Sequence, residues 1–498
     1  MAVVELQSVD LRFVIGPILS ALKHHPDIER LMLLSRGATL DYADAAERLS
    51  GIPLLLRLMH LTTLPNHDIE RLLVGLRRRL LEQLDAGSVG LPFSAALATQ
   101  CFLNEYIYPE SLEEEEALKA LAECIKSTLD ERSHLPPVWI AAAAAYRPLH
   151  QFPWAVALLD RNWPPAVRGI LQQQIEEPAA EREIQGTIPR LTPIADAVSV
   201  QVRQQYEANP YPRWTRLAVP DAPAPLADYL RRWCSTPELS RIALPASPEI
   251  LVAGCGTGRH SLLVAKAYSG ARVLAIDISL ASLSYAIRKT RELGALNIEY
   301  GQADLLRIAE AGRRFDYIES IGVLHHLNDP TAGFRALAGV LRPGGLMRIG
   351  VYSEAQRRNW FTKVRALTEE ALPEDADAIR YLRQVIVSRA FGSPPDPDLD
   401  EAARSLDFFS LSECRDLLFH VQEHQFTASG IHDALRRSGL QFVGFEESVN
   451  REAMQAFRRM HPEPHAVASL PLWDLFERRT GTNVWYRFLC QKPLDSTP

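Results

Sequence analysis

Hydrophobic residues near the start of the chain recur at the spacing of buried helix faces. Leucine and isoleucine return every three or four positions across 54–61 and 69–80, which indicates amphipathic helices. Asn66 or Asp68 is placed to cap the second of these helices, and Ser111 with Glu114 forms a capping-box pattern before another. We therefore predict an all-helical domain over residues 1–190.

Two organisations of this helical domain stay open. Stacked helix pairs of the tetratricopeptide type repeat about every 34 residues, but no such period holds over three units here. The domain is thus either a degenerate, tetratricopeptide-like array that binds a protein partner or an irregular set of helices. The charged runs Arg77–Arg79 and Glu113–Glu116 are interpreted as solvated helix faces.

The pattern changes twice further along the chain. Proline becomes frequent between residues 186 and 248, although one helical stretch persists near 195–207, so we predict a linker and lid segment over 191–248. Beyond it, short apolar runs alternate with amphipathic stretches, which is typical of a parallel sheet with crossover helices. The second domain is therefore α/β and spans 249–498. Its first five strands are expected at 249–253, 272–276, 297–301, 315–320 and 346–352.

The first expected strand ends in a glycine-rich loop, Gly254-Cys255-Gly256-Thr257-Gly258. Glycines let the backbone approach a ligand where a side chain would collide, and the N-terminus of the next helix offers N–H donors and a positive dipole end. Asp277 follows the second strand, 19 positions after Gly258, where a carboxylate can accept from ribose hydroxyls. Arg259 stands where a dinucleotide fold needs a small residue, which disfavours a nicotinamide cofactor.

In combination these features resemble the class I S-adenosylmethionine-dependent methyltransferases, over residues 250–352. The resemblance rests on 250–258, Asp277, Asp304, the segment Val-Leu-His-His-Leu at 323–327 and the turn Leu-Arg-Pro-Gly-Gly at 341–345. It implies a Rossmann-like α/β fold with S-adenosyl-L-methionine as the cofactor. It also implies site residues: the methionine and ribose side is lined by Gly254, Gly256 and Gly258, the ribose is bound by Asp277, and the adenine is faced by Ala303 and Asp304.

One position departs from that family. Its members commonly carry an acid two residues before the first glycine, and this chain has Val252 there. A contact that helps to hold the methionine amino group is therefore missing or supplied elsewhere. Glu249 does not replace it in register, whereas Glu319 is a candidate carboxylate near the end of the fourth strand.

The remainder of the second domain also fits the family. A final helix at 428–438 and an antiparallel hairpin at 441–446 and 483–490 are expected, after an insertion over 354–427 that is long enough to cover an active site. His420 and His424 fall one helical turn apart in this insertion. No third ligand accompanies them, so we interpret both as helix-surface residues and expect no metal site.

Two further groups of residues are candidates for the acceptor side. His325 and His326 follow the fourth strand, at the sheet edge where ligands bind, and act either as a general base or as pocket wall. Upstream, aromatic residues and prolines alternate over 206–214. This segment is either a lid that contacts the acceptor or a rigid linker packed on the helical domain; its candidate residues are Tyr206, Asn209, Tyr211 and Trp214.

Composition narrows the class of protein. Hydrophobic residues make up 47% of the chain and the net charge is -7, which argues against a dedicated nucleic-acid binder. Six scattered cysteines without a CxxC pair suggest neither a disulfide framework nor a zinc site. The N-terminus does not read as a secretory signal and no apolar run is long enough to span a membrane. A cytoplasmic protein is expected.

Together these features predict a cytoplasmic methyltransferase whose helical domain selects or presents the acceptor. The acceptor is a small molecule or a protein. The alternative is an adaptor that binds the cofactor without turnover and uses its helical domain to hold a protein partner. Val252 is the one sequence feature that favours the adaptor.

Overall fold

The computed structural model of the 498-residue chain describes residues 4, 9–35, 40–84, 90–237, 239, 242–368 and 375–494. The chain forms two compact units, each built from several stretches. The first, called the helical unit, comprises Met1–Arg182, Arg213–Ala218 and Lys363–Phe419. The second, called the sheet unit, comprises Glu183–Pro212, Val219–Thr362 and His420–Pro498.

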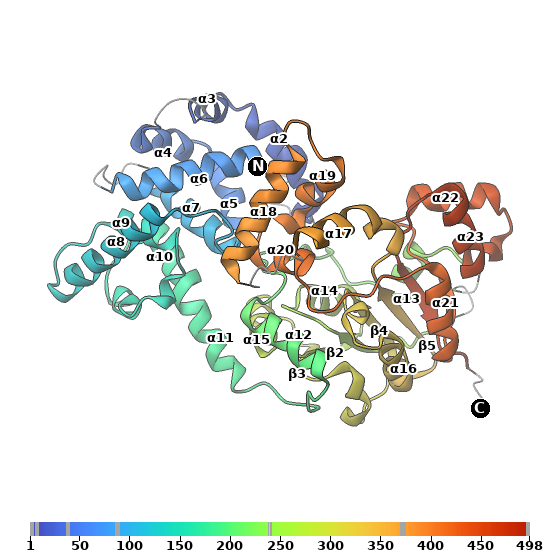
Figure 1. The fold of residues 1–498 in the computed structure, drawn as a ribbon. Helices are drawn as coiled ribbons and strands as arrows, with labels where there is room; N and C mark the ends of the chain where they lie inside the picture. The colour runs from blue at the N-terminus through green and yellow to red at the C-terminus, as the bar shows by residue number, and fades with distance from the viewer. Residues whose placement is uncertain are drawn as a thin grey trace. The chain divides into compact units, whose positions relative to one another are not determined.

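The regular elements described in the helical unit are all helices (Figure 1), as the hydrophobic spacing predicts. The longer ones are α2 (Ile15–Lys23), α3 (Pro26–Leu34), α4 (Tyr42–Ser50), α5 (Pro53–Leu61), α6 (His67–Glu82), α7 (Leu91–Leu103), α8 (Leu112–Asp130), α9 (Pro137–Ala144), α10 (Pro165–Leu171), α18 (Ala376–Ala390), α19 (Pro397–Arg404) and α20 (Leu411–Leu418). Short helices η1 (Leu11–Phe13), η2 (Leu149–Gln151), η3 (Ala155–Asp160), η4 (Gln172–Glu176) and η8 (Leu406–Phe408) lie between them. Two further helices, α11 (Glu177–Gln185) and α17 (Glu354–Thr368), carry the chain from one unit into the other.

The predicted helix caps are confirmed. The Asn66 side chain accepts hydrogen bonds from the main-chain N–H groups of Asp68 and Ile69, each at 3.1 Å. Ser111 and Glu114 form a complete capping box at the start of α8. Each cap satisfies N–H groups that have no partner inside the helix.

The inserted stretch 363–419 belongs to the helical unit because buried charges fix it there. The Arg383 guanidinium on α18 contacts both carboxylate oxygens of Glu70 on α6, at 2.7 and 2.6 Å, and both side chains are buried. A paired guanidinium and carboxylate can remain in a protein interior, whereas either one alone is costly. The stretch 213–218 is held similarly, since the Thr215 hydroxyl donates to the Leu61 carbonyl at 2.5 Å.

The described residues of the sheet unit form a seven-stranded sheet with the order β3-β2-β1-β4-β5-β7-β6. The strands β1 to β5 pair in parallel, and β7 pairs antiparallel with both β5 and β6. This arrangement confirms the Rossmann-like fold with an added antiparallel pair. The strands are β1 (Glu249–Ala253), β2 (Arg272–Asp277), β3 (Ile298–Gln302), β4 (Phe315–Ile321), β5 (Leu341–Gly350), β6 (Gln441–Phe445) and β7 (Arg487–Gln491).

Helices cover both faces of this sheet (Figure 1), so its parallel strands are almost continuously apolar. One face packs against α13 (Leu226–Trp233), α14 (Arg259–Ala267) and α15 (Leu280–Glu292). The other packs against α16 (Pro330–Val340), α21 (Ala428–Arg437), α22 (Arg451–Met460) and α23 (Leu470–Thr480). Other helices in the described part of the unit are α12 (Ala197–Ala208), η6 (Leu305–Ala311), η7 (Leu324–His326) and η9 (Pro464–Ala468).

The compact units differ from the expected division into 1–190, 191–248 and 249–498. Residues 183–212 are part of the sheet unit. The main chain there pairs alongside β3, with Leu191 N–H donating to the Gln302 carbonyl and Gln302 N–H to the Pro189 carbonyl, both at 2.8 Å. Ile184 and Ile188 also enter the core on one face of the sheet.

Three local expectations differ from the structure. Residues 419–427 form no helix, so His420 and His424 do not share a helix face. The last two strands pair antiparallel as expected, but α22, η9 and α23 lie between them, so they are not joined as a hairpin. The predicted turn 342–345 is a bulge within β5, since β4 pairs with Leu341 before it and with Leu346 after it.

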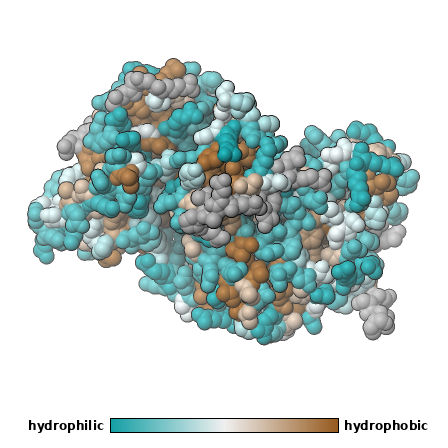
Figure 2. Space-filling view, viewed as in Figure 1, coloured by the Kyte–Doolittle hydropathy of each residue, from teal (hydrophilic) through white to brown (hydrophobic). Residues whose placement is uncertain are grey.

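Hydrophilic residues cover most of the face shown in Figure 2, and hydrophobic residues are visible there as separate patches. The described helices include none that is both long enough and apolar enough to pass through a membrane.

Candidate functional site

The glycine loop follows β1 and needs glycine for steric reasons. Gly254, Gly256 and Gly258 have φ angles of 76°, 52° and 81°, a region that L-residues rarely adopt. A Cβ atom would lie 2.3 Å from the Val323 side chain at Gly254 and 2.6 Å from the Tyr211 carbonyl oxygen at Gly256. Another residue would therefore displace its neighbours.

Asp277, at the end of β2, ties the glycine loop to the start of α15. Its carboxylate accepts from the main-chain N–H of Gly256 at 2.8 Å and of Ser279 at 2.9 Å. Burial raises the pKa of Asp277, and these backbone donors oppose that rise. Each carboxylate oxygen keeps a second lone pair, so the group can still accept from a ligand.

Ala303 and Asp304 follow β3 and lie beside Asp277. The Ala303 N–H donates to the Asp277 carbonyl at 3.0 Å. The Asp304 N–H donates to the Thr192 hydroxyl at 2.8 Å, and its carboxylate accepts from the Leu306 N–H at 3.0 Å. Burial raises the pKa of Asp304. The structure thus brings the two predicted carboxylates to neighbouring strand ends.

Residues 206–212, called the strap, are bonded to both of these loops. At one end the Tyr206 carbonyl accepts from the Ser279 hydroxyl at 3.1 Å, and the Glu207 carboxylate accepts from the main-chain N–H groups of Leu280 and Ala281 at 2.7 and 3.0 Å. At the other end Thr257 donates its N–H to the Tyr211 carbonyl at 3.3 Å and its hydroxyl to the Pro212 carbonyl. The strap therefore spans the glycine loop and the Asp277 loop.

The four predicted lid residues are divided between the two units. Tyr206, Asn209 and Tyr211 are in the sheet unit, with Asn209 capping the end of α12. Trp214 is in the helical unit, where it is buried.

His326 lies in η7 with its ring orientation fixed. Its Nδ1 is 2.8 Å from the Gln422 carbonyl oxygen. Because a carbonyl only accepts, Nδ1 carries the proton and Nε2 has the basic lone pair. Burial, together with the neighbouring His325 and His420, holds the pKa of His326 well below its usual value. The imidazole is therefore neutral at pH 7.

A second imidazole, that of His420, is stacked on His326 with ring centroids 3.4 Å apart and planes 18° apart. His420 Nδ1 accepts from the Gln422 N–H at 3.2 Å, and its Nε2 is 3.2 Å from the Tyr206 hydroxyl. The loop 420–424 thus completes the neighbourhood of the predicted histidine. Sequence reasoning missed this contact because it assigned the loop to a helix surface.

His325 differs from His326 in having no polar partner for its ring. It is fully buried, and neither ring nitrogen has a hydrogen-bond partner in the described part of the chain. Its ring lies 3.8 Å from that of Tyr352, and burial holds its pKa well below the usual value. The Arg357 guanidinium covers the Tyr352 ring at 3.5 Å and pairs with Glu423 at 3.0 Å. Tyr352 lies two residues after the end of β5, and the expected fifth strand ends at this residue.

Glu319 occupies the position beside Val252. The two residues are register partners on β4 and β1, so their side chains share one face of the sheet. The buried Glu319 carboxylate accepts from His260 on α14, from the Tyr268 hydroxyl at 2.9 Å and from Arg348 at 3.0 Å. Burial alone would raise the pKa of Glu319, but His260 and Arg348 hold it well below its usual range. A carboxylate therefore lies one strand away from the position of the missing acid.

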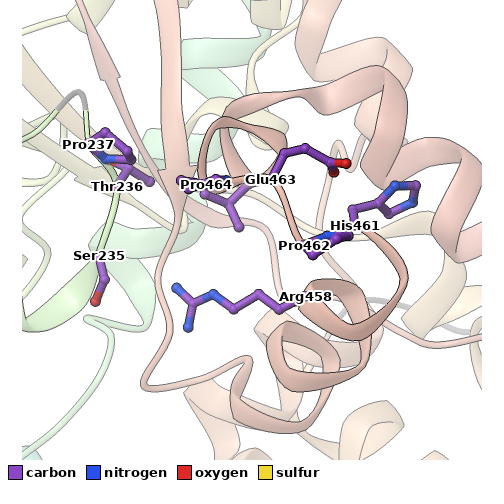
Figure 3. Close-up of a pocket in the computed structure, with 9 residues that line it drawn as sticks. Ser235, Thr236, Pro237, Arg458, His461, Pro462, Glu463 and Pro464 are labelled. Atoms are coloured by element: carbon purple, nitrogen blue, oxygen red, sulfur yellow. The ribbon is translucent and has the colours of Figure 1, made fainter.

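A separate pocket of about 500 Å³ lies in the sheet unit (Figure 3), and none of the predicted site residues lines it. Its lining residues are Ser235, Thr236, Pro237, Arg458, His461, Pro462, Glu463, Pro464 and Val467.

Comparison with known proteins agrees with this geometry. A family model described as a methyltransferase domain matches residues 250–345. An uncharacterized protein of Synechococcus sp. is 32% identical over 298 residues, covering 56% of this chain and 68% of that protein. A ubiquinone biosynthesis O-methyltransferase of Parvibaculum lavamentivorans is 34% identical over 23% of this chain and 44% of its own length. The matched part therefore spans less than half of that O-methyltransferase.

The sheet unit carries a class I S-adenosylmethionine-dependent methyltransferase domain. The structure of PKMT2 from Rickettsia typhi in complex with AdoHcy is also similar, at 18% identity and a TM-score of 0.42, covering 58% of this chain and 55% of that one.

S-adenosylmethionine is the cofactor of this methyltransferase family, and the residues present fit it. The glycine loop leads into the N-terminus of α14, whose N-cap residue Gly258 provides no side-chain cap, so the first N–H groups of the helix can face a ligand. The Asp277 carboxylate lies at the same edge with acceptor capacity left. A nucleoside with a vicinal diol suits that carboxylate, because each hydroxyl can donate to one oxygen.

Proposed function

We propose that this methyltransferase transfers the methyl group of S-adenosylmethionine to an oxygen atom of a small-molecule or protein acceptor. The observation that carries the proposal is the neutral His326, whose proton is fixed on Nδ1 by the Gln422 carbonyl. A buried imidazole with a lone pair on Nε2 can take the proton of a hydroxyl group. The name of the Parvibaculum relative, an O-methyltransferase, supports the same class of acceptor.

The cofactor supplies an electrophilic methyl group carried on a sulfonium sulfur. The residues of the chain then have to bind the cofactor, orient the acceptor and remove the proton from its hydroxyl group. Asp277 and the glycine loop hold the nucleoside side, and the adenine is assigned to Ala303 and Asp304. His326 accepts the hydroxyl proton on Nε2 as the acceptor oxygen becomes nucleophilic. Burial of the histidines keeps bulk water away from this edge of the sheet.

The position of Glu319 weakens the sequence argument for the adaptor alternative. Val252 suggested a lost cofactor contact, but Glu319 brings a carboxylate to the neighbouring register position. We propose that the helical unit selects the acceptor. We also propose that the protein acts in the cytoplasm.

The test is turnover with a methyl-labelled cofactor in a cell extract, read by mass spectrometry of labelled products and by formation of S-adenosylhomocysteine. We expect label in an oxygen-linked methyl group, and a large loss of rate in His326→Gln with unchanged cofactor affinity. Tight cofactor binding without turnover in any extract would instead support the adaptor. Label on nitrogen or carbon would overturn the assignment of an oxygen acceptor.

A further inference from the structure

We propose that Tyr206 is a positioning residue that connects the Asp277 loop to the ring of His326. The inference deepens the proposed function, because it takes His326 as the base. It rests on two sets of contacts made by one residue, one through its backbone and one through its side chain.

The backbone of Tyr206 is fixed to the loop that carries Asp277. Its carbonyl accepts from the Ser279 hydroxyl at 3.1 Å, while the Ser279 N–H donates to the Asp277 carboxylate at 2.9 Å. The next residue, Glu207, accepts from two N–H groups at the start of α15. A carboxylate at a helix N-terminus is favourable because it meets unpaired donors and the positive dipole end. The main chain at Tyr206 therefore follows any movement of this loop.

The side chain of Tyr206 reaches the stacked histidines. Because His420 Nδ1 accepts from the Gln422 N–H, the proton of the neutral ring is on Nε2, which then donates to the Tyr206 hydroxyl oxygen at 3.2 Å. These two bonds help to orient the His420 ring. Its face lies 3.4 Å from that of His326, so the plane of one ring limits the plane of the other.

Gln422 completes the arrangement from the opposite side. Its carbonyl accepts from His326 Nδ1, and its N–H donates to His420. Both rings are thus attached to one residue of the loop 420–424, and Tyr206 supplies a side-chain bond from the strap. Without the Tyr206 hydroxyl, His420 loses its bond to the strap, so the ring that stacks on His326 is less constrained.

The experiment follows the imidazole ring of His326 by NMR in the full chain labelled with ¹³C-histidine, with the signal assigned from His326→Gln. Tyr206→Phe removes the hydroxyl alone. Tyr229→Phe is the matched control, since Tyr229 lies on α13 among Trp233 and Tyr268 and outside the site. S-adenosylhomocysteine is the probe, and its affinity is measured by calorimetry.

In the wild type we expect the His326 signal to carry an upfield shift from the stacked His420 ring and to move when the probe binds. In Tyr206→Phe the upfield shift should diminish and the response to the probe should be lost, while the dissociation constant of the probe changes by less than about threefold. Tyr229→Phe should match the wild type in all three measurements. A second variant, His420→Gln, should remove the upfield shift as well.

An unchanged His326 signal in Tyr206→Phe, with and without probe, would overturn the inference. So would a lost probe response in the Tyr229→Phe control, because the effect would then not belong to Tyr206. Failure of the wild type to bind the probe would contradict the proposed function instead. The ring shift in the probe-free protein would still decide whether Tyr206 positions the two histidines.

Discussion

Replacement of Gly256 by alanine is the sharpest test of the strap. Placing an alanine at φ 52° destabilises the folded state by about 1–2 kcal/mol, because L-residues disfavour the left-handed backbone conformation. Its Cβ would also lie 2.6 Å from the Tyr211 carbonyl oxygen, closer than two such atoms can approach, so the strap must move. Loss of the hydrogen bond from the Thr257 N–H to that carbonyl adds about 1 kcal/mol.

The matched control is Gly312→Ala. Gly312 has a φ of 68° and open space where its Cβ would stand, so it pays the backbone cost alone. We expect Gly256→Ala to be less stable than Gly312→Ala by about 1 kcal/mol in thermal unfolding. It should also bind S-adenosylhomocysteine on the order of tenfold more weakly, and chymotrypsin should cleave it faster after Tyr206. Equal stability and equal affinity in the two variants would refute the argument that Tyr211 closes on the loop.

Three further outcomes are expected. Asp277→Ala should weaken binding of S-adenosylhomocysteine by about 1.5–3 kcal/mol, since it removes a charged acceptor; wild-type affinity in calorimetry would contradict the assigned role. Arg383→Met should destabilise the protein by about 3–5 kcal/mol in thermal unfolding, because it leaves Glu70 buried without its partner, and double replacement with Glu70→Leu should recover much of that loss. Burial raises the pKa of Glu477 from 4.5 to about 7, so the folded state binds the proton of this carboxyl group more tightly than the unfolded state does. The free energy of unfolding should therefore fall as the pH rises between those two values, by at most about 3 kcal/mol. Glu477→Gln should flatten that part of the pH profile, and an unaltered profile would show that Glu477 titrates normally.

The parts of the fold that could be predicted depend on short stretches of sequence. β1, the glycine loop and Asp277 are contiguous or nearly so, and their spacing is enforced by strand and loop geometry. The β strands are recognisable because helices bury both faces of the sheet and leave apolar runs. The caps at Asn66 and Ser111 depend on the three residues that follow each of them.

The contacts that escaped prediction depend on distant segments or on main-chain atoms. Any residue at position 211 has a carbonyl, so nothing in its identity shows that this group lies against Gly256. His420 contacts His326 because the loop 420–424 returns to η7. The spacing of His420 and His424 matches one turn of a helix, so nothing in the sequence indicates this loop. The proximity of Glu319 to Val252 follows from the register of β4 on β1, and register is set by the packing of the entire sheet.

The way the chain alternates between its two units affects its synthesis on the ribosome. The helical unit lacks residues 363–419 until the greater part of the sheet unit has been translated. The carboxylate of Glu70 meets its guanidinium partner 313 residues later in the sequence. At about 5–20 residues per second, that interval is on the order of 15–60 s. During this time the helix that carries Glu70 has an uncompensated acid at a future core position, so its final packing is completed only after Arg383 has been translated.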